Sequence, residues 1–277
     1  MKKFIKICFL FLLFNNYYSQ NIQGVVYNED NKPISGAIVG IEGQEVGSIT
    51  DEKGGFSIDL TNADKNKNFI TYIGGFEPFK IKISDYLNKS NHNVILKEKV
   101  INIQEVELTA QKTYEKNLGT NKKSNTRYCG YNSKNNKALF NEYAIKIKNK
   151  KNVKLKNINV NVCDYKLETP VVLVFDVYSS NGDIPNESIV GETLSKEISS
   201  TDINNHQISL DVSDKNIWVD GDFFVSVRTA NDFNGYLYFS GNIFTFSQDT
   251  YYRVYYGDWK KFSSGTPSIN VDVLIKK

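Results

Sequence analysis

Apolar and polar positions alternate along most of the chain, which is typical of β-strands that bury one face and expose the other. The alternating runs are rich in Val, Ile, Tyr, Phe and Thr, and Gly, Asn and Asp stand between them. No long stretch has apolar residues at the spacing of a helix. The pattern therefore predicts an all-β protein.

The N-terminus departs from this alternation. Lys2, Lys3 and Lys6 precede a continuous apolar run over residues 7–14, and polar residues follow as far as Gln20. This is the layout of a secretory signal peptide, with an apolar run too short to span a bilayer. We expect residues 1–20 to be the signal peptide, cleavage near 19–21, and export through the inner membrane to the periplasm, outer membrane or cell surface. A lipoprotein acylated at Cys8 is the less favoured alternative, because Cys8 lies inside the apolar run.

Residues 22–109 predict a small antiparallel sandwich. Pro33 and Gly36 suit a turn between the first two strands, and Asp51 with Gly54 and Gly55 suits a second turn. We expect strands at Ile22–Tyr27, Ala37–Ile41, Gly47–Thr50, Gly55–Asp59, Phe69–Ile73, Phe79–Ile83, Asn93–Lys97 and Gln104–Thr109.

Three runs in this region carry a family resemblance: Asn31–Val39 (NKPISGAIV), Gly47–Ile58 (GSITDEKGGFSI) and Ile70–Phe76 (ITYIGGF). Together with Val94–Glu98 and Glu105–Ala110 they resemble the carboxypeptidase-regulatory-like domain, a transthyretin-like sandwich of the carbohydrate-binding-like group of folds. The resemblance implies a non-catalytic appendage, such as those beside peptidase domains, on TonB-dependent receptors and in exported binding proteins of the bacterial envelope. Sugar binding is not general among these domains.

Residues 110–137 are rich in Lys and Asn and predict a linker, and residues 138–277 predict a larger, jelly-roll-like β-sandwich. This second part weakly resembles the sandwich paired with the same first domain in exported bacterial proteins, at Ile184–Ile189, Trp218–Val227 and Tyr252–Lys261. We expect strands at Asn141–Lys148, Ile158–Asp164, Val171–Ser179, Ser188–Ser195, Gln207–Val212, Phe223–Thr229, Tyr236–Ser240, Tyr251–Tyr255 and Ser268–Ile275.

Catalytic chemistry has few candidates in the sequence. His92 and His206 each lie in an Asn-rich turn, and there is no histidine pair at helical spacing, no Cys–His cluster and no Gly-rich phosphate loop. We therefore expect no catalytic residue, no metal and no cofactor. Carboxylate pairs such as Asp220 and Asp222 leave an unrecognised hydrolase open as an alternative.

Aromatic residues gather near the C-terminus, in the run Tyr251–Trp259. The strand period places Tyr251, Arg253 and Tyr255 on one face. An exposed face of this kind suits sugar stacking or contact with a protein, whereas the alternative is packing inside the core. The candidate ligand or partner contacts are Tyr251, Arg253, Tyr255, Trp259 and Trp218.

Charge is unevenly distributed. The chain has 34 Lys or Arg and 31 Asp or Glu, but without the signal peptide it is formally neutral, so net charge gives no reason to expect nucleic acid. Residues 110–157 carry +11, between segments of −4 and −7. The densest group of lysines in this segment predicts contact with an anionic outer-membrane surface or acidic glycan. The alternative is that these lysines belong to an edge strand and discourage it from pairing with other chains. These lysines are Lys146, Lys148, Lys150, Lys151, Lys154 and Lys156.

Two cysteines, Cys129 and Cys163, remain in a compartment that permits disulfides. A disulfide between them and a pair of separate thiols are both open, because the sequence does not give the Cα separation.

The sequence thus predicts an exported, non-catalytic envelope protein that serves as a binding or scaffold module for a protein or glycan. A carbohydrate-binding accessory protein of outer-membrane nutrient uptake is the first alternative, and the hydrolase is the second.

Overall fold

The computed structural model describes residues 20–100, 113–135, 140–244 and 249–276. The expected signal peptide, except Gln20, and the strand expected at 104–109 lie outside these residues. Among the described residues there is one α-helix, the five-residue α2 (Ile83–Leu87), and none is long and apolar enough to cross a membrane. The all-β prediction is confirmed.

The first domain is a sandwich of two sheets, with strand orders β4-β1-β7 and β3-β2-β5-β6. Alternation explains which side chains fill it: in β4, Phe56 and Ile58 are buried while Ser57 and Asp59 are exposed. The strands are β1 (Asn21–Asn28), β2 (Ile38–Ile41), β3 (Gly47–Ile49), β4 (Gly55–Asp59), β5 (Asn68–Tyr72), β6 (Phe79–Lys82) and β7 (Val94–Leu96).

One feature of this sandwich corrects the sequence prediction. The prediction was wholly antiparallel, but β7 pairs with β1 in parallel, at Val26 to Val94 and Tyr27 to Ile95. The alternation of apolar and polar residues predicts which face a strand buries, but it does not predict whether the strand runs parallel or antiparallel to its neighbour. The parallel pairing of β7 with β1 could therefore not be predicted from this pattern. The predicted turn at Asp51 is present: its Oδ1 accepts hydrogen bonds from the backbone amides of Lys53 and Gly55, both at 2.8 Å.

The second domain is a larger sandwich, whose described residues form one seven-stranded and one eight-stranded sheet. The seven-stranded sheet has the order β13-β12-β17-β10-β19-β20, with β14 also paired to β12; the eight-stranded sheet has the order β21-β18-β11-β22-β8, with β15 and β16 paired to β11 and β9 to β18. Buried side chains of both sheets, including Phe175, Phe223 and Phe239, form one core between them.

The strands of this domain are β8 (Thr113–Gly119), β9 (Arg127–Asn132), β10 (Asn141–Ile147), β11 (Val153–Leu167), β12 (Val171–Asn181), β13 (Ile184–Ser188), β14 (Leu194–Ile198), β15 (Gln207–Asp211), β16 (Trp218–Val219), β17 (Phe223–Thr229), β18 (Gly235–Asn242), β19 (Thr250–Val254), β20 (Lys260–Lys261), β21 (Thr266–Pro267) and β22 (Ile269–Lys276). Two short 3₁₀ turns, η1 (Ser200–Asp202) and η2 (Ser213–Lys215), lie between them.

The structure has two strands, β8 and β9, where the sequence predicted a linker at residues 110–137. β8 pairs along its whole length with β22, and β9 pairs with β18, so both belong to the second domain. Their sequences are polar because they are half exposed, and only Tyr114, Leu118, Cys129 and Tyr131 reach the core. The single strand predicted at 188–195 is likewise replaced by β13 and β14, which pair with different parts of β12.

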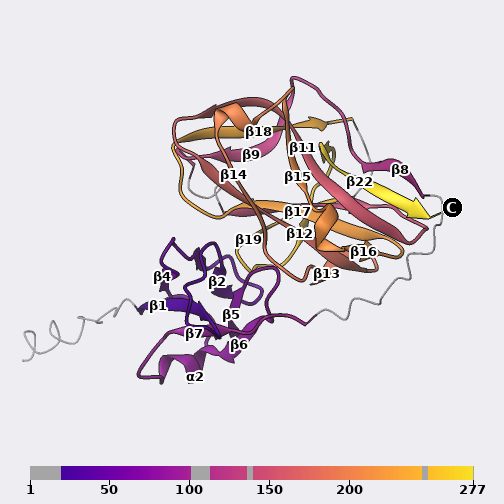
Figure 1. Cartoon of the computed structure of the whole chain (residues 1–277). Helices are drawn as coiled ribbons and strands as arrows, with labels where there is room; N and C mark the ends of the chain where they lie inside the picture. The colour runs from indigo at the N-terminus through magenta and orange to yellow at the C-terminus, as the bar shows by residue number, and fades with distance from the viewer. Residues whose placement is uncertain (1–19, 101–112, 136–139, 245–248, 277) are drawn as a thin grey trace, which may run out of the picture.

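The two domains are stacked sheet against sheet (Figure 1). In β5, Phe69 points into the first domain's core, whereas Ile70 and Tyr72 point out of it. Ile70 and Tyr72 pack against Ala144, Tyr178, Phe224 and Tyr251 of the seven-stranded sheet, and these residues form a third apolar cluster. The outer face of that sheet is therefore an interface rather than a free surface.

Candidate functional site

Strand β17 shows how the seven-stranded sheet buries both faces. Phe223, Val225 and Val227 point into the second domain's core, and the alternate positions face the first domain. All seven residues of β17 are buried. A polar side chain on a strand that is covered on both sides needs a hydrogen-bond or ion-pair partner within the protein, because water is excluded there.

A buried ion pair supplies such partners. Arg253 Nε donates to Glu142 Oε2 at 2.7 Å, and the hydroxyls of Tyr178 and Ser226 donate to Glu142 Oε1 at 2.8 and 2.6 Å. Burial alone would raise the pKa of Glu142, but Arg253, Ser226 and Arg228 together hold that pKa below its ordinary value. The carboxylate is therefore charged and fully paired, and its role is to hold β10, β12, β17 and β19 together at the interface.

A second carboxylate, Asp176, joins the domains directly. The Tyr72 hydroxyl of the first domain donates to Asp176 Oδ2, and Ser188 Oγ and the Val177 amide donate to Oδ1 at 2.7 and 2.8 Å. Burial raises the pKa of Asp176 to about 6, although these donors act in the opposite direction. Asp176 therefore titrates above the ordinary range of an aspartate, at the contact between domains.

Backbone contacts complete the interface. Arg228 Nη2 donates to the Gly36 carbonyl at 2.7 Å, and Thr193 Oγ1 donates to the Gly74 carbonyl at 2.8 Å. Glycine makes this approach feasible: a Cβ on Gly36 would lie 2.9 Å from Ala230 Cβ, and one on Gly75 would lie 2.5 Å from Glu192 Cα. Several glycines of the first domain therefore face the second.

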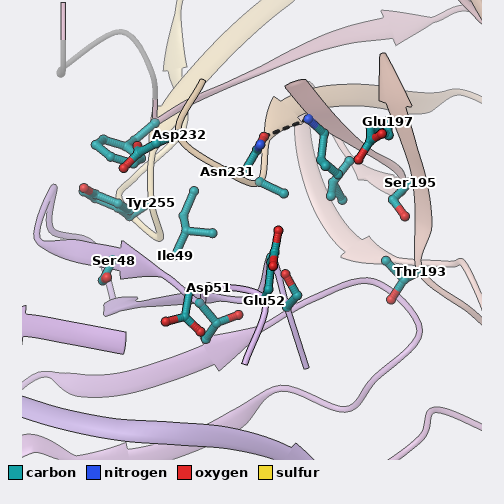
Figure 2. Close-up of a pocket in the computed structure, with 17 residues that line it drawn as sticks. Ser48, Ile49, Asp51, Glu52, Thr193, Ser195, Glu197, Asn231, Asp232 and Tyr255 are labelled. Carbon is teal, nitrogen blue, oxygen red and sulfur yellow. Dashed lines mark hydrogen bonds between the residues drawn. The ribbon is translucent and has the colours of Figure 1, made fainter. Parts of the chain in front are cut away.

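A cleft of about 480 Å³ opens at one edge of this interface (Figure 2). The first domain contributes Asp51 and Glu52 from the turn before β4, and the second contributes Glu197 from β14 and Asp232 from the segment after β17. Among the described residues that line the cleft, four are acidic and none is basic. Asp51 is engaged in its turn, so the other three carboxylates are available to a ligand.

Tyr255 forms one wall of the cleft, beside Asp232 (Figure 2). Its φ of 51° lies in the left-handed region, which costs a tyrosine on the order of 1–3 kcal/mol. The half-buried ring stacks on Phe140 with centroids 5.0 Å apart, and it packs so closely on Gly47 that a Cβ there would lie 2.5 Å from Tyr255 Cγ. Burial, with a contribution from Asp232, raises the pKa of Tyr255 to about 12, so the hydroxyl stays protonated as a donor.

The residues predicted to contact a ligand separate into three places. Tyr251 and Arg253 are buried in the interface, and Trp259 lies beside them with the Arg253 guanidinium 4.3 Å from its ring centroid. Tyr255 lines the cleft, and Trp218 lies on the eight-stranded sheet with Lys276 over its ring. The period-two reasoning placed Tyr251, Arg253 and Tyr255 on one face, but β19 ends at Val254 and the left-handed turn at Tyr255 separates it from the other two.

Sequence reasoning missed Glu142, Asp176 and Arg228. The signal was present in the composition of their strands: Asp176 interrupts the apolar run of β12, and Arg228 ends a similar run in β17. A charged residue inside a continuous apolar strand indicates that both faces are covered and that a buried partner exists.

The lysines of the basic segment are mostly paired. Lys146 contacts Asp183 and Asp222 at 3.0 and 3.2 Å, Lys148 contacts Asp249 at 3.0 Å, and Lys156 contacts Glu115. Lys151 Nζ donates to the Tyr114 hydroxyl at 3.1 Å, and Lys154 Nζ to Asn216 Oδ1 at 2.8 Å. Lys150 has no such partner among the described residues.

Cys129 and Cys163 are two free thiols in the structure. Cys129 lies on β9 and Cys163 on β11, and β18 pairs between these two strands. Strands two positions apart are roughly 9–10 Å from each other, which exceeds the Cα separation that a disulfide spans. The disulfide alternative therefore does not fit this sheet order.

Comparison with protein families identifies the first domain. Residues 22–108 match the family model described as the CarboxypepD_reg-like domain. The first domain is a CarboxypepD_reg-like domain. Two turns inside the matched region, at Pro33–Gly36 and Asp51–Gly55, present Gly36, Asp51 and Glu52 to the second domain and the cleft. The strand Asn68–Tyr72 of the same domain supplies Ile70 and Tyr72 to the interface.

The other comparisons add little to the CarboxypepD_reg-like match. No curated protein matches the chain. Among solved structures, the crystal structure of BcpA, the major pilin subunit of Bacillus cereus, aligns with 12% sequence identity over 90% of this chain and 68% of its own. The TM-score is 0.16, so this likeness supports no inference.

Proposed function

We propose that the protein is an exported, non-catalytic binding module of the bacterial envelope, and that its partner binds in the cleft between the two domains. The cleft carries this proposal, because its volume of about 480 Å³ lies within the range of ligand sites and both domains are needed to form it. In this function the CarboxypepD_reg-like domain is a scaffold that completes the site.

The charge of the cleft favours a basic ligand. Glu52, Glu197 and Asp232 are exposed, and no cation among the described lining residues balances them. A lysine or arginine side chain would be attracted by the three carboxylates and could donate hydrogen bonds to them. A sugar could also donate hydroxyls to carboxylates, but stacking would need a free ring face, and Tyr255 is covered by Phe140 and Gly47. We therefore favour a basic segment of a protein over a glycan.

A non-catalytic role is supported by the positions of the two histidines. His92 packs beside Tyr86 in the first domain, and His206 lies in a turn beside Tyr165. Neither is among the described residues that line the cleft, so its carboxylates have no imidazole as a partner for acid–base chemistry.

The proposal is tested by the binding of an octalysine peptide to the mature protein, measured by calorimetry at low salt. Neutralising the three exposed carboxylates should weaken binding by more than tenfold, because each contributes a charge-assisted contact. A control that removes the same charge outside the cleft should retain binding. The test variant is Glu52→Gln, Glu197→Gln and Asp232→Asn; the control is Glu29→Gln, Asp30→Asn and Asp214→Asn.

Three outcomes would overturn the proposal in different ways. Equal binding by the test and control variants would show that general charge attraction, rather than the cleft, retains the peptide. Retention of neutral glycans on an array, lost in the test variant, would replace the basic protein segment with a sugar. Hydrolysis of a glycan or peptide by the protein, abolished in the test variant, would establish the hydrolase alternative instead.

A further inference from the structure

A second cavity lies in the second domain, where β8 and β22 meet the loop between β10 and β11. Its volume is about 450 Å³. Four lysines line it: Lys116 from β8, and Lys148, Lys150 and Lys151 from the loop. It shares no residue with the interdomain cleft, and its charge has the opposite sign.

Asp222 is the one carboxylate among the described residues that line this cavity, and it is already neutralised. Asp222 accepts a hydrogen bond from the Asn149 amide at 2.9 Å and lies 3.2 Å from Lys146 Nζ. Lys116 and Lys150 are exposed and have no hydrogen bond or ion pair within the described part of the chain. Like charges held in a small volume repel one another, and a bound anion would relieve this repulsion.

Hydrogen bonds within the protein hold the loop in place. Asn149 is buried, and its Nδ2 donates to the carbonyls of Lys151 and Gly221 at 2.5 and 3.2 Å. Lys151 is fixed in turn by the Tyr114 hydroxyl at 3.1 Å. A preorganised loop loses little conformational entropy on binding, so these contacts favour a ligand rather than merely a solvated surface.

Apolar side chains provide the rest of the lining. Leu118 and Ile275 line the cavity together with the ring of Tyr114. A bare anion would use only the ammonium groups, whereas a ring that carries an anionic group would use both the lysines and the apolar surface. The volume suits a ligand of one or two sugar rings.

We propose that this cavity binds an anionic saccharide, with its phosphate or carboxylate on Lys116 and Lys150 and its ring against Leu118 and Ile275. Of the four lysines that line the cavity, these two would contact the anion, because Lys148 is paired with Asp249 and Lys151 with the Tyr114 hydroxyl. The proposal is independent of the proposed function of the interdomain cleft. Phosphorylated sugars occur both in glycolipid headgroups and in soluble form, and both sources share this chemistry.

The test uses the mature protein with glucose 6-phosphate, glucuronate, glucose and inorganic phosphate, measured by calorimetry and by NMR shifts of the Leu118 and Ile275 amides. Glucose 6-phosphate or glucuronate should bind, and glucose should not. Lys116→Gln and Lys150→Gln should each weaken binding about tenfold, since each removes one charge-assisted contact. Lys154→Gln is the matched control, because Lys154 belongs to the same segment and lies outside the cavity.

Three results would overturn the proposal: no binding of either anionic sugar at millimolar concentration, unchanged binding by Lys116→Gln and Lys150→Gln, or an equal loss in Lys154→Gln. Inorganic phosphate that binds as tightly as glucose 6-phosphate would refute the role of the ring. Because Lys116 and Lys150 are exposed and unpartnered within the described residues, their replacement should not disturb folding, which the melting temperature checks. Binding to vesicles with lipopolysaccharide, compared with phosphatidylcholine alone, separates the two sources of the sugar.

Discussion

Removing the Tyr72 hydroxyl should loosen the contact between the domains. In Tyr72→Phe, the buried Asp176 Oδ2 loses its donor from the first domain, while Ser188 Oγ and the Val177 amide still serve Oδ1. A hydrogen bond to a buried charged group contributes about 1.5–3 kcal/mol. At pH 7.5, where Asp176 is ionised, we therefore expect the free energy of unfolding or undocking to fall by about 2 kcal/mol.

The pKa of Asp176 makes this effect depend on pH. Its value of about 6 in the folded protein lies above the ordinary 3.8. Between these two values the folded state holds a proton that the unfolded state has released, so stability falls as pH rises from about 4 to 6, by roughly 3 kcal/mol for a shift of about two units. Burial is the main cause, with Glu142 adding to it, while the Tyr72 and Ser188 hydroxyls oppose it. Loss of the Tyr72 hydroxyl should raise the pKa of Asp176 further and enlarge the loss of stability between pH 4 and pH 7.5.

The measurement is urea unfolding at pH 4 and pH 7.5, followed by tryptophan fluorescence in a Trp218→Phe background. Trp259 then reports the interface, because it packs on Tyr178 and Arg253. Tyr27→Phe is the control, since no hydrogen bond of the Tyr27 hydroxyl is present among the described residues. The reasoning fails if Tyr72→Phe destabilises the protein equally at both pH values, or no more than Tyr27→Phe does.

Three further predictions follow from the same interface and sheets. Gly36→Ala should destabilise the protein by roughly 1–3 kcal/mol in urea titrations, because the new Cβ meets Ala230 at 2.9 Å and φ is 74°. Gly182 also has a positive φ, 63°, but no atom lies near an added Cβ, so Gly182→Ala measures the backbone strain alone. Equal losses of stability in the two variants would show that the contact with Ala230 contributes nothing. Arg253→Met should cost about 3–5 kcal/mol in the same assay, because it leaves Glu142 buried without its ion pair; a loss under about 1 kcal/mol would contradict a charged Glu142. Non-reduced, unfolded protein of residues 21–277, which lacks Cys8, should react with two equivalents of a thiol reagent, since Cys129 and Cys163 are separate thiols; a count of zero would instead show a disulfide.

Much of the fold could be predicted, because the alternation and the turn residues that indicate a strand lie within a few neighbouring positions of the chain. The turn at Asp51 and the alternation of Phe56 and Ile58 appear in the structure as the pattern predicted. Strands β8 and β9 escaped prediction because their polar residues, such as Glu115 and Lys116, face solvent while few side chains reach the core. A half-exposed edge strand and a polar linker have similar composition, and only the pairing with β22 or β18 distinguishes them.

The sequence by itself determined the all-β class, the CarboxypepD_reg-like domain and the uneven charge, because each depends on residue type and short-range spacing. Only the tertiary structure decided where the charges and rings act. It buried Tyr251 and Arg253 between the domains, left Tyr255 at a cleft of carboxylates, and gathered Lys116 with Lys150 and Lys151 around a second cavity. These sites join residues far apart in the chain, and period-two alternation carries no information about which sheet will cover an outward face.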